Sequence, residues 1–345
     1  MLLWPAEDLE FVRKTLGGST LKFRNKKILL TGATGFIGKS LLESLLWINE
    51  VESLNIKLQC ISRDPSKFFS LNPHFLGYTG LRVLKGDVRD SFNQIDFGPV
   101  DFVIHAATDV ITQDDPLELL ESCINGTSNV LKYAKENGCK SFLLLSSGAV
   151  YGQQPETIKR FPEFYIGGVD LISSKSGYAL GKQVSEWLTQ QASSIDMGVK
   201  VARCFAFVGP YLPLDKHFAI GNFIQSALLG RDIEIAGDGT PVRTYLYTSD
   251  LCIWLLKILL DGSTGGVWNV GGEEAVSIKR LAEIVREELN PKIAIKVLKP
   301  PEVFGGKYAP DISRVATDFG LTPQVNLRQA LQKTAQWNLK YANTK

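Results

Sequence analysis

Several classes of protein are excluded by what this sequence has little of. It carries 38 Lys and Arg against 36 Asp and Glu, a formal net charge of +2, so it lacks the basic excess typical of nucleic-acid-binding proteins. Its five cysteines are scattered without the spacing of a metal site or a redox motif, which indicates reduced thiols in a reducing compartment. The most apolar stretch, residues 251–260, contains Lys257 and is too short to span a membrane. Because the first residues also lack a signal-peptide pattern, we expect a soluble, cytoplasmic protein with no nucleic-acid partner, membrane partner or metal.

What is present is the composition of an ordinary globular protein. Hydrophobic residues make up 44% of the 345 positions and charged residues 21%, which excludes a disordered or fibrous chain. The length fits two domains or one large α/β unit. The 31 glycines exceed the average share, so their positions carry information.

From residue 26, apolar runs of strand length alternate with helix-length amphipathic segments. The predicted strands are residues 27–31, 58–62, 82–85, 102–105, 142–146 and 199–205. The predicted helices between them include residues 39–48, 117–137 and 178–192. This alternation is the signature of βαβ units, so we predict an α/β fold of the Rossmann type, a doubly wound parallel sheet covered by helices.

Three regions follow from this pattern. Residues 1–25 form an N-terminal extension with a short helix over 6–16, and residues 26–206 form the Rossmann domain. Residues 207–345 are rich in turn signals and predict a smaller, loop-rich cap, some of whose segments return to the first domain. Its helices are expected at residues 222–229, 250–260, 278–289 and 327–337, with Ser277 and Asn326 as N-caps.

A glycine-rich turn joins the first predicted strand to the following helix. It reads Thr31-Gly32-Ala33-Thr34-Gly35-Phe36-Ile37-Gly38. Gly32 permits a tight turn, Gly35 lets the backbone approach a pyrophosphate, and Gly38 allows close packing of helix on strand. The free N–H groups and the dipole of the helix N-terminus favour an anion there, so the turn predicts dinucleotide binding.

Further motifs occur in a fixed order along the chain. They are Gly86-Asp87-Val88-Arg89-Asp90, Val103-Ile104-His105-Ala106-Ala107, Asn125 within a long helix, Ser146-Ser147-Gly148-Ala149-Val150-Tyr151-Gly152, and Tyr178-Ala179-Leu180-Gly181-Lys182. Together with the glycine turn they resemble the extended short-chain dehydrogenase/reductases of the NAD(P)-dependent nucleotide-sugar epimerase/dehydratase family, over roughly residues 26–340. The resemblance implies cofactor contacts from Gly32, Thr34, Gly35, Phe36, Ile37, Gly38, Arg63, Asp87, Val88, Ala106, Ala107, Thr108, Asn125, Tyr178, Lys182 and Phe205.

The same resemblance implies a catalytic set of Ser147, Tyr178 and Lys182. Tyr178 and Lys182 are four residues apart, so on a helix they share one face. A tyrosine with a pKa near 10 is a weak base at neutral pH, but a neighbouring ammonium and an oxidised nicotinamide both stabilise the phenolate. Ser147 is placed to orient a sugar hydroxyl, whose proton Tyr178 removes while a hydride passes to the nicotinamide.

The residues after Ser147 bear on which reaction follows. Family 4,6-dehydratases have Asp and Glu at the two following positions, and uronate decarboxylases have Glu at the second, whereas this chain has Gly148 and Ala149. Small residues there are similar to those of epimerases, so we expect a nucleotide-sugar 4-epimerase. An NADPH-dependent nucleotide-4-keto-sugar reductase is the alternative; a 4,6-dehydratase and a non-catalytic dinucleotide-binding protein fit less well.

The end of the second predicted strand bears on the choice of cofactor. A ribose-binding acid often stands there, but this chain has Ser62 and then Arg63. An arginine can pair with a 2′-phosphate, which favours NADP, while Asp64 one step later keeps NAD open.

The family resemblance also implies substrate contacts in the cap. Asn222, Phe223, Arg243 and Arg314 fall where the family binds a nucleotide diphosphate, besides Ser147 at the sugar. Ala206 and Val208 depart from the Asn and Tyr that the family commonly has. His105 is expected to be structural, and His217 to be a loop histidine. The helix over 178–192 is expected at a homodimer interface, as in the family.

Overall fold

The computed structural model describes residues 2–90, 98–108, 115–216, 218–300 and 306–341, and it divides into two compact units. The first unit comprises Met1–Val150, Val169–Arg203 and Cys252–Trp268, and the second Tyr151–Gly168, Cys204–Leu251 and Asn269–Lys345. Two segments therefore depart from the expected division of the chain at residue 206. Residues 151–168 belong to the second unit, and residues 252–268 return to the first.

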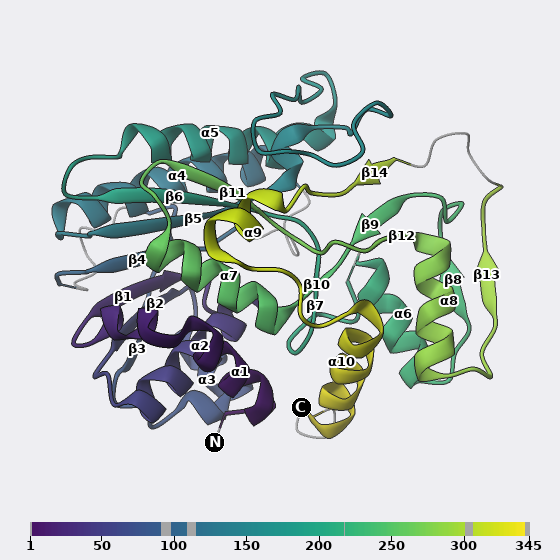
Figure 1. Ribbon diagram of the computed structural model, residues 1–345, viewed down its shortest axis with the longest axis horizontal. Helices are drawn as coiled ribbons and strands as arrows, with labels where there is room; N and C mark the ends of the chain where they lie inside the picture. Colours follow the sequence, from purple (N-terminus) through teal and green to yellow (C-terminus); the bar gives the residue numbers. More distant parts are fainter. Residues whose placement is uncertain (1, 91–97, 109–114, 217, 301–305, 342–345) are drawn as a thin grey trace. The chain divides into compact units, whose positions relative to one another are not determined.

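The first unit is built on a central sheet of seven strands, six of which the sequence predicts; the seventh, at residues 266–270, was not expected (Figure 1). The strands are β1 (Lys27–Thr31), β2 (Lys57–Ser62), β3 (Leu81–Lys85), β4 (Phe102–His105), β5 (Ser141–Ser147), β6 (Gly198–Cys204) and β11 (Gly266–Val270). Their order in the sheet is β11-β6-β5-β4-β1-β2-β3, and β1 pairs in parallel with both β2 and β4. This reversal of strand order between β1 and β4 is the switch point of a doubly wound Rossmann fold, so the predicted fold class is confirmed.

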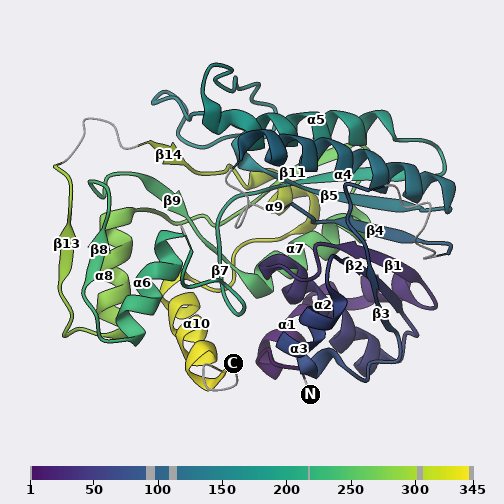
Figure 2. The same cartoon turned by 180° about the vertical axis from the view of Figure 1, so that it is seen from behind.

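Helices cover both faces of this sheet (Figures 1 and 2). On one face α4 (Pro116–Glu136) and α5 (Gly177–Gln191) lie side by side. On the other lie α2 (Phe36–Glu52) and α7 (Thr248–Asp261), and α3 (Pro65–Leu71) follows β2. All seven residues of β5 are buried, as expected for a strand covered on both faces.

The N-terminal extension belongs to the first unit. It forms α1 (Ala6–Leu16) and a 3-10 helix, η1 (Gly17–Phe23). The backbone N–H of Leu3 donates to the fully buried Glu43 carboxylate of α2 at 3.1 Å. At the other end of the extension, Lys22 contacts Asp261 of α7 at 2.6 Å. The extension is thus tied to the two helices that cover one face of the sheet.

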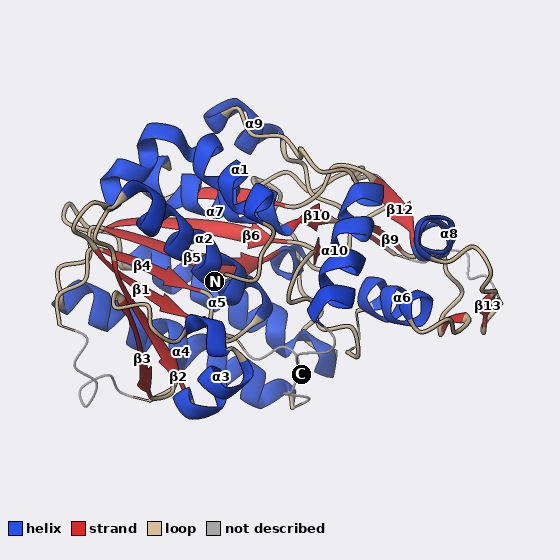
Figure 3. Cartoon of the chain, turned by 90° about the horizontal axis from the view of Figure 1, so that it is seen from below, coloured by secondary structure: helices blue, strands red, loops and turns tan. Residues whose placement is uncertain are grey.

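The second unit is a smaller assembly of helices and short strands (Figure 3). Helices α6 (Ala219–Leu228), α8 (Ile278–Leu289) and α10 (Leu327–Tyr341) pack against one another, and α9 (Ser313–Phe319) is short. The strand pairs are β7 (Phe207–Val208) with β10 (Leu246–Tyr247) and β8 (Ile233–Ile235) with β13 (Ile295–Val297). β9 (Val242–Thr244) lies between β12 (Ala275–Ser277) and β14 (Lys307–Tyr308). The Ser277 and Asn326 side chains cap α8 and α10, as the sequence predicts.

Candidate functional site

The turn between β1 and α2 has no room for side chains at two of its glycines. Gly32 has a φ of +72°, and a Cβ there would lie 2.7 Å from the backbone of Ala106 on the neighbouring strand. A Cβ on Gly38 would lie 2.0 Å from the Gly32 carbonyl oxygen. The N-terminus of α2 therefore comes close to β1 and β4, and its free N–H groups form a cradle that suits a pyrophosphate.

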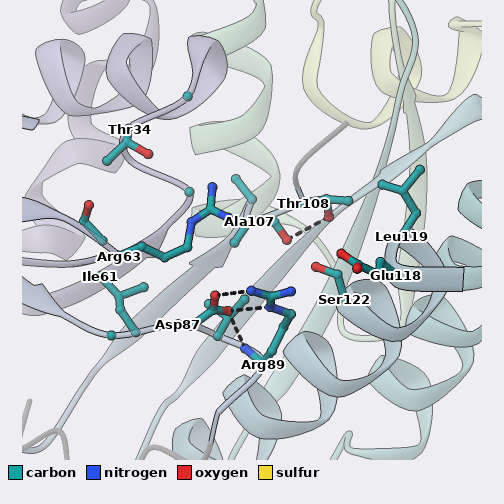
Figure 4. A pocket seen from close by; sticks show the side chains of 16 residues that line it. Thr34, Ile61, Arg63, Asp87, Arg89, Ala107, Thr108, Glu118, Leu119 and Ser122 are labelled. Carbon is teal, nitrogen blue, oxygen red and sulfur yellow. Dashed lines mark hydrogen bonds and ion pairs between the residues drawn. The ribbon is translucent and has the colours of Figure 1, made fainter. Parts of the chain in front are cut away.

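A pocket of about 370 Å³ opens beside this turn (Figure 4). Nine residues expected to contact the cofactor line it: Gly32, Thr34, Gly35, Arg63, Asp87, Val88, Ala106, Ala107 and Thr108. The carboxyl ends of β1, β2, β3 and β4 meet at this edge, which explains why motifs far apart in sequence come together. Phe36 and Ile37 are half-buried in the first turn of α2.

Three pocket residues come from the start of α4 and carry no family motif. They are Glu118, Leu119 and Ser122, and Ser122 shares a helical face with the other two because it lies four and three positions after them. Asp115 caps α4 by accepting from the Leu117 N–H at 2.8 Å, and so fixes where this face begins. An aspartate followed by Pro116 marks the start of the helix in the sequence, but the register toward the pocket is visible only in the structure.

Two arginines flank Asp87 in the pocket (Figure 4). Arg89 donates to both carboxylate oxygens, from Nε at 3.1 Å and from Nη2 at 2.8 Å. Burial raises the pKa of Asp87, but the hydrogen bonds from Arg89 outweigh it, so the pKa is lowered overall. Arg63 reaches from the end of β2 into the pocket, whereas Asp64 caps α3 by accepting from the Lys67 N–H at 2.9 Å.

The three expected catalytic residues all belong to the first unit. Ser147 ends β5 and is buried, and its Oγ accepts from the Ala149 N–H at 3.1 Å. Tyr178 is half-buried near the start of α5, and the Lys182 Nζ lies 5.9 Å from the centre of its ring. Lys182 is only 4% exposed and donates to the Thr108 Oγ1 at 2.9 Å and to the Leu145 carbonyl at 2.8 Å. A buried ammonium beside the phenol ring favours the phenolate form of Tyr178.

Asn125, which is expected at the cofactor, lies on a different face of α4 from Cys123. Asn125 is exposed on α4. Its neighbour two positions earlier, Cys123, is buried there instead and forms a side-chain hydrogen bond with Thr108. Burial raises the pKa of the Cys123 thiol, and the Lys182 charge lowers it to a smaller extent. Residues two apart on a helix point in nearly opposite directions, so Cys123 is the one of the two that packs near Lys182, and a cofactor contact from Asn125 stays a prediction.

The expected substrate residues lie in the second unit and differ in exposure. Phe223 is 3% exposed, and its side chain lies in the interior of this unit. Asn222 is exposed on α6, and Arg314 is exposed on α9, with Asp318 at 3.7 Å. The guanidinium of Arg243 lies 5.7 Å from the centre of the Tyr308 ring. Phe205, expected at the cofactor, packs against Tyr308 with ring centres 4.6 Å apart, and His217 lies outside the described residues.

Metal clusters, membrane-spanning helices and disulfides are all absent from the part of the chain that the structure describes. Within residues 2–90, 98–108, 115–216, 218–300 and 306–341, no three His, Cys, Asp or Glu side chains gather closely enough to hold a metal ion. None of the helices in those ranges combines the length and the apolar character needed to cross a membrane. The five cysteines are buried and form no disulfide.

Comparison with known proteins gives concordant results. The family model described as "NAD dependent epimerase/dehydratase family" matches residues 28–271. UDP-glucuronic acid decarboxylase 3 of Arabidopsis thaliana is 30% identical over 315 residues, which cover 89% of this chain and 87% of the relative.

Two solved structures share the fold. A variant of UDP-glucuronic acid 4-epimerase from Bacillus cereus, in complex with NAD and a fluorinated UDP-glucuronic acid, superposes with a TM-score of 0.77 at 23% identity, covering 91% of this chain and 99% of that one. The dTDP-glucose 4,6-dehydratase from Bacillus anthracis, in complex with NAD, also has a TM-score of 0.77, at 22% identity, covering 92% of this chain and 98% of that one.

Proposed function

The chain belongs to the NAD-dependent epimerase/dehydratase family, and from that premise we propose that it is a nucleotide-sugar 4-epimerase acting by transient oxidation of carbon 4. The observation that carries the proposal is a contrast within one site. Ser147, Tyr178 and Lys182 are present for oxidation, whereas the turn after Ser147 offers Gly148 and Ala149 in place of an acid and a base.

Three side chains share the work of oxidation. Tyr178 removes the proton of the sugar hydroxyl, and the Lys182 ammonium, 5.9 Å from its ring, stabilises the phenolate that this requires. Ser147 donates a hydrogen bond that orients the hydroxyl toward Tyr178. General base catalysis of this kind contributes about 10²–10⁴ in rate.

The residues at the glycine turn fit a dinucleotide. Gly32 and Gly38 leave a cradle that a Cβ would fill, and the N-terminus of the 17-residue helix α2 opens onto it. Gly32, Gly35 and Thr34 would hold the pyrophosphate, and Asp87 with Val88 the adenosine. Bound there, NAD would supply a reversible hydride acceptor for the sugar.

The choice between NAD and NADP remains part of the proposal. Relatives of the same fold hold NAD, so the expectation of NADP from Arg63 has no support among them. Arg63 nevertheless lines the pocket while Asp64 caps α3, and this observation keeps the NADPH-dependent reductase as a second candidate.

The substrate class follows from the relatives and from two arginines. The curated relatives act on UDP-glucuronic acid, and a structural relative is a 4-epimerase of the same compound. We therefore favour a UDP-hexose or UDP-hexuronic acid, with Arg243 and Arg314 binding the diphosphate. A decarboxylase is disfavoured because Ala149 stands where that group of the family has Glu. A cytoplasmic location and a homodimer through α5, where Trp187 is 61% exposed, are also part of this proposal.

A single set of measurements tests the proposal. The purified protein is denatured to identify any retained nucleotide, and fresh protein is incubated with UDP-glucose, UDP-glucuronic acid and dTDP-glucose while products are followed by NMR. We expect retained NAD, a 4-epimer from one of the UDP-sugars, no CO₂ and no 4-keto-6-deoxy sugar. Release of CO₂ from UDP-glucuronic acid would replace the proposal with a decarboxylase, and turnover only of a keto sugar with NADPH would replace it with the reductase.

A further inference from the structure

A buried chain of polar side chains runs through the first unit behind the catalytic lysine. Its members are Thr31 at the end of β1, His105 at the end of β4, Thr127 on α4 and Ser185 on α5. Each is no more than 2% exposed. Thr31 and His105 are direct neighbours in the sheet, which places their side chains together. The chain therefore joins two strands and two helices in the interior.

The direction of the hydrogen bonds can be assigned from both ends. The Thr31 Oγ1 accepts from the N–H groups of Ala106 and Ala107, both at 3.2 Å, so its own proton points to the His105 Nδ1 at 2.8 Å. At the far end the Ser185 Oγ donates to the carbonyls of Gly181 at 2.9 Å and Cys123 at 3.0 Å.

The middle of the chain is then determined. Because the Ser185 proton is used on carbonyls, its oxygen accepts from the Thr127 hydroxyl at 3.0 Å. The Thr127 oxygen in turn accepts from the His105 Nε2, 3.2 Å away. His105 is thus a neutral imidazole with its proton on Nε2. Burial, with a smaller effect of the Lys182 charge, lowers the pKa of His105 to about 3, in agreement with this assignment.

Each end of this hydrogen-bonded series contacts backbone next to Lys182 or next to its hydrogen-bond acceptor, Thr108. One end fixes Ala106 and Ala107, the residues just before Thr108, whose Oγ1 accepts from the Lys182 Nζ. The other end fixes the carbonyl of Gly181, the residue just before Lys182. A Cβ on Gly181 would lie 2.7 Å from the Cβ of Cys123, so α4 and α5 are closely packed here. The hydrogen-bonded side chains from Thr31 to Ser185, together with the hydrogen bond from Lys182 to Thr108, form a closed ring of contacts.

We propose that His105, Thr127 and Ser185 are positioning residues for Lys182, holding the end of β4 and α5 in register so that the ammonium stays beside Tyr178. This inference rests on the proposed function, since it concerns the same catalytic centre. None of the three side chains touches the reacting atoms; they act through the backbone on either side of the lysine and its acceptor. A displacement of about 1 Å at such a centre can cost up to about 100-fold in rate.

The tautomer can be tested without any turnover. The protein has 3 histidines, so labelling with ¹⁵N-histidine gives few NMR signals. The signal that disappears in His105→Gln is that of His105. We expect a neutral ring with its proton on Nε2 that does not titrate between pH 5 and pH 8. A proton on Nδ1, or titration in that range, would overturn the proposed chain whether or not the protein is an epimerase.

The positioning role is tested by a matched pair of variants. Thr127→Val removes the hydroxyl at nearly constant shape, whereas Thr127→Ser keeps it. We expect Thr127→Val to lower kcat about 10-fold or more, to leave KM and NAD affinity within about twofold, and to move the rise of kcat with pH to higher pH. The reason is that a loosely held ammonium stabilises the Tyr178 phenolate less. Thr127→Ser should restore both the rate and the pH profile.

A control and a second variant keep the test decisive. Thr334→Val removes another buried helix hydroxyl, bonded to the Ala330 carbonyl at 2.6 Å in the second unit, and should lower only thermal stability. Ser185→Ala breaks the same chain and replaces Thr127→Val if that variant does not fold. An unchanged kcat and pH profile in either folded variant would overturn the role. Absence of turnover in the wild type would instead count against the proposed function. The histidine measurement would still test the hydrogen-bond directions assigned from Thr31 to Ser185.

Discussion

The surroundings of Lys182 and the turn after Ser147 are neighbouring parts of one catalytic centre, but they are built differently. Around Lys182 the side chains of Thr108, Thr127 and Ser185 are buried or half-buried and hydrogen-bonded. After Ser147 the chain provides only the small residues Gly148 and Ala149. In the proposed function, the first region supports the oxidation of the sugar. The second region lacks the acid and the base expected of a dehydratase and the Glu expected of a decarboxylase, and the proposed choice of product rests on that difference.

The largest effect is expected from breaking the first region. Tyr178→Phe removes the general base and should lower kcat by about 10³-fold or more, with NAD affinity within about twofold, because the glycine turn is untouched. The two quantities are measured by NMR turnover and by NAD titration. Retained activity in Tyr178→Phe would contradict the assignment of the base, and lost NAD binding would show that the variant had damaged the pocket instead.

A smaller effect is expected from a residue outside both regions. Arg243→Ala removes a guanidinium proposed for the diphosphate and should raise KM about 10- to 100-fold, with kcat little changed, because charge-assisted hydrogen bonds contribute about 1.5–3 kcal/mol. Arg280→Ala is the matched control, since Arg280 is an exposed arginine paired with Glu283 on α8. Equal KM values in the two variants would remove Arg243 from the substrate site.

The smallest effect is expected from introducing an acidic side chain into the turn after Ser147. Ala149→Glu places a carboxylate where family decarboxylases have one, and a single group seldom creates a new activity without its supporting neighbours. We expect slower epimerisation and a minor release of CO₂ or of a keto product from UDP-glucuronic acid, measured by NMR with ¹³C-labelled substrate. An unaltered product ratio and rate would mean that the identity of residue 149 does not decide the outcome.

The sequence predicts the sheet and the cofactor turn well because their signals are local. The strand over residues 102–105 coincides with β4, and the glycine turn lies where expected. Helix ends were less accurate: residues 39–48 were predicted where α2 spans Phe36–Glu52, because its first turn follows the glycines directly.

The site was less predictable where it depends on which way a helix faces. Asn125 and Cys123 lie two positions apart in one motif, and only packing against Gly181 shows which of them approaches Lys182. That the side chain of Phe223 is buried in the second unit is likewise visible only in the structure. The proposed role of His105 depends on hydrogen-bond partners from two other elements, Thr31 of β1 and Thr127 of α4, and a single sequence does not bring these together.

The return of residues 252–268 to the first unit has a consequence for how the chain is made. Most of α7 and β11 reach the sheet only after much of the second unit has been synthesised, and Cys252 of α7 forms a side-chain hydrogen bond with Ser44 of α2. On the ribosome, the cofactor unit therefore stays open along β6 and over α2 until residue 268 has emerged. A fragment that stops at residue 206 would carry Ser147, Tyr178 and Lys182, the proposed catalytic residues, and would leave β6 without its neighbour β11.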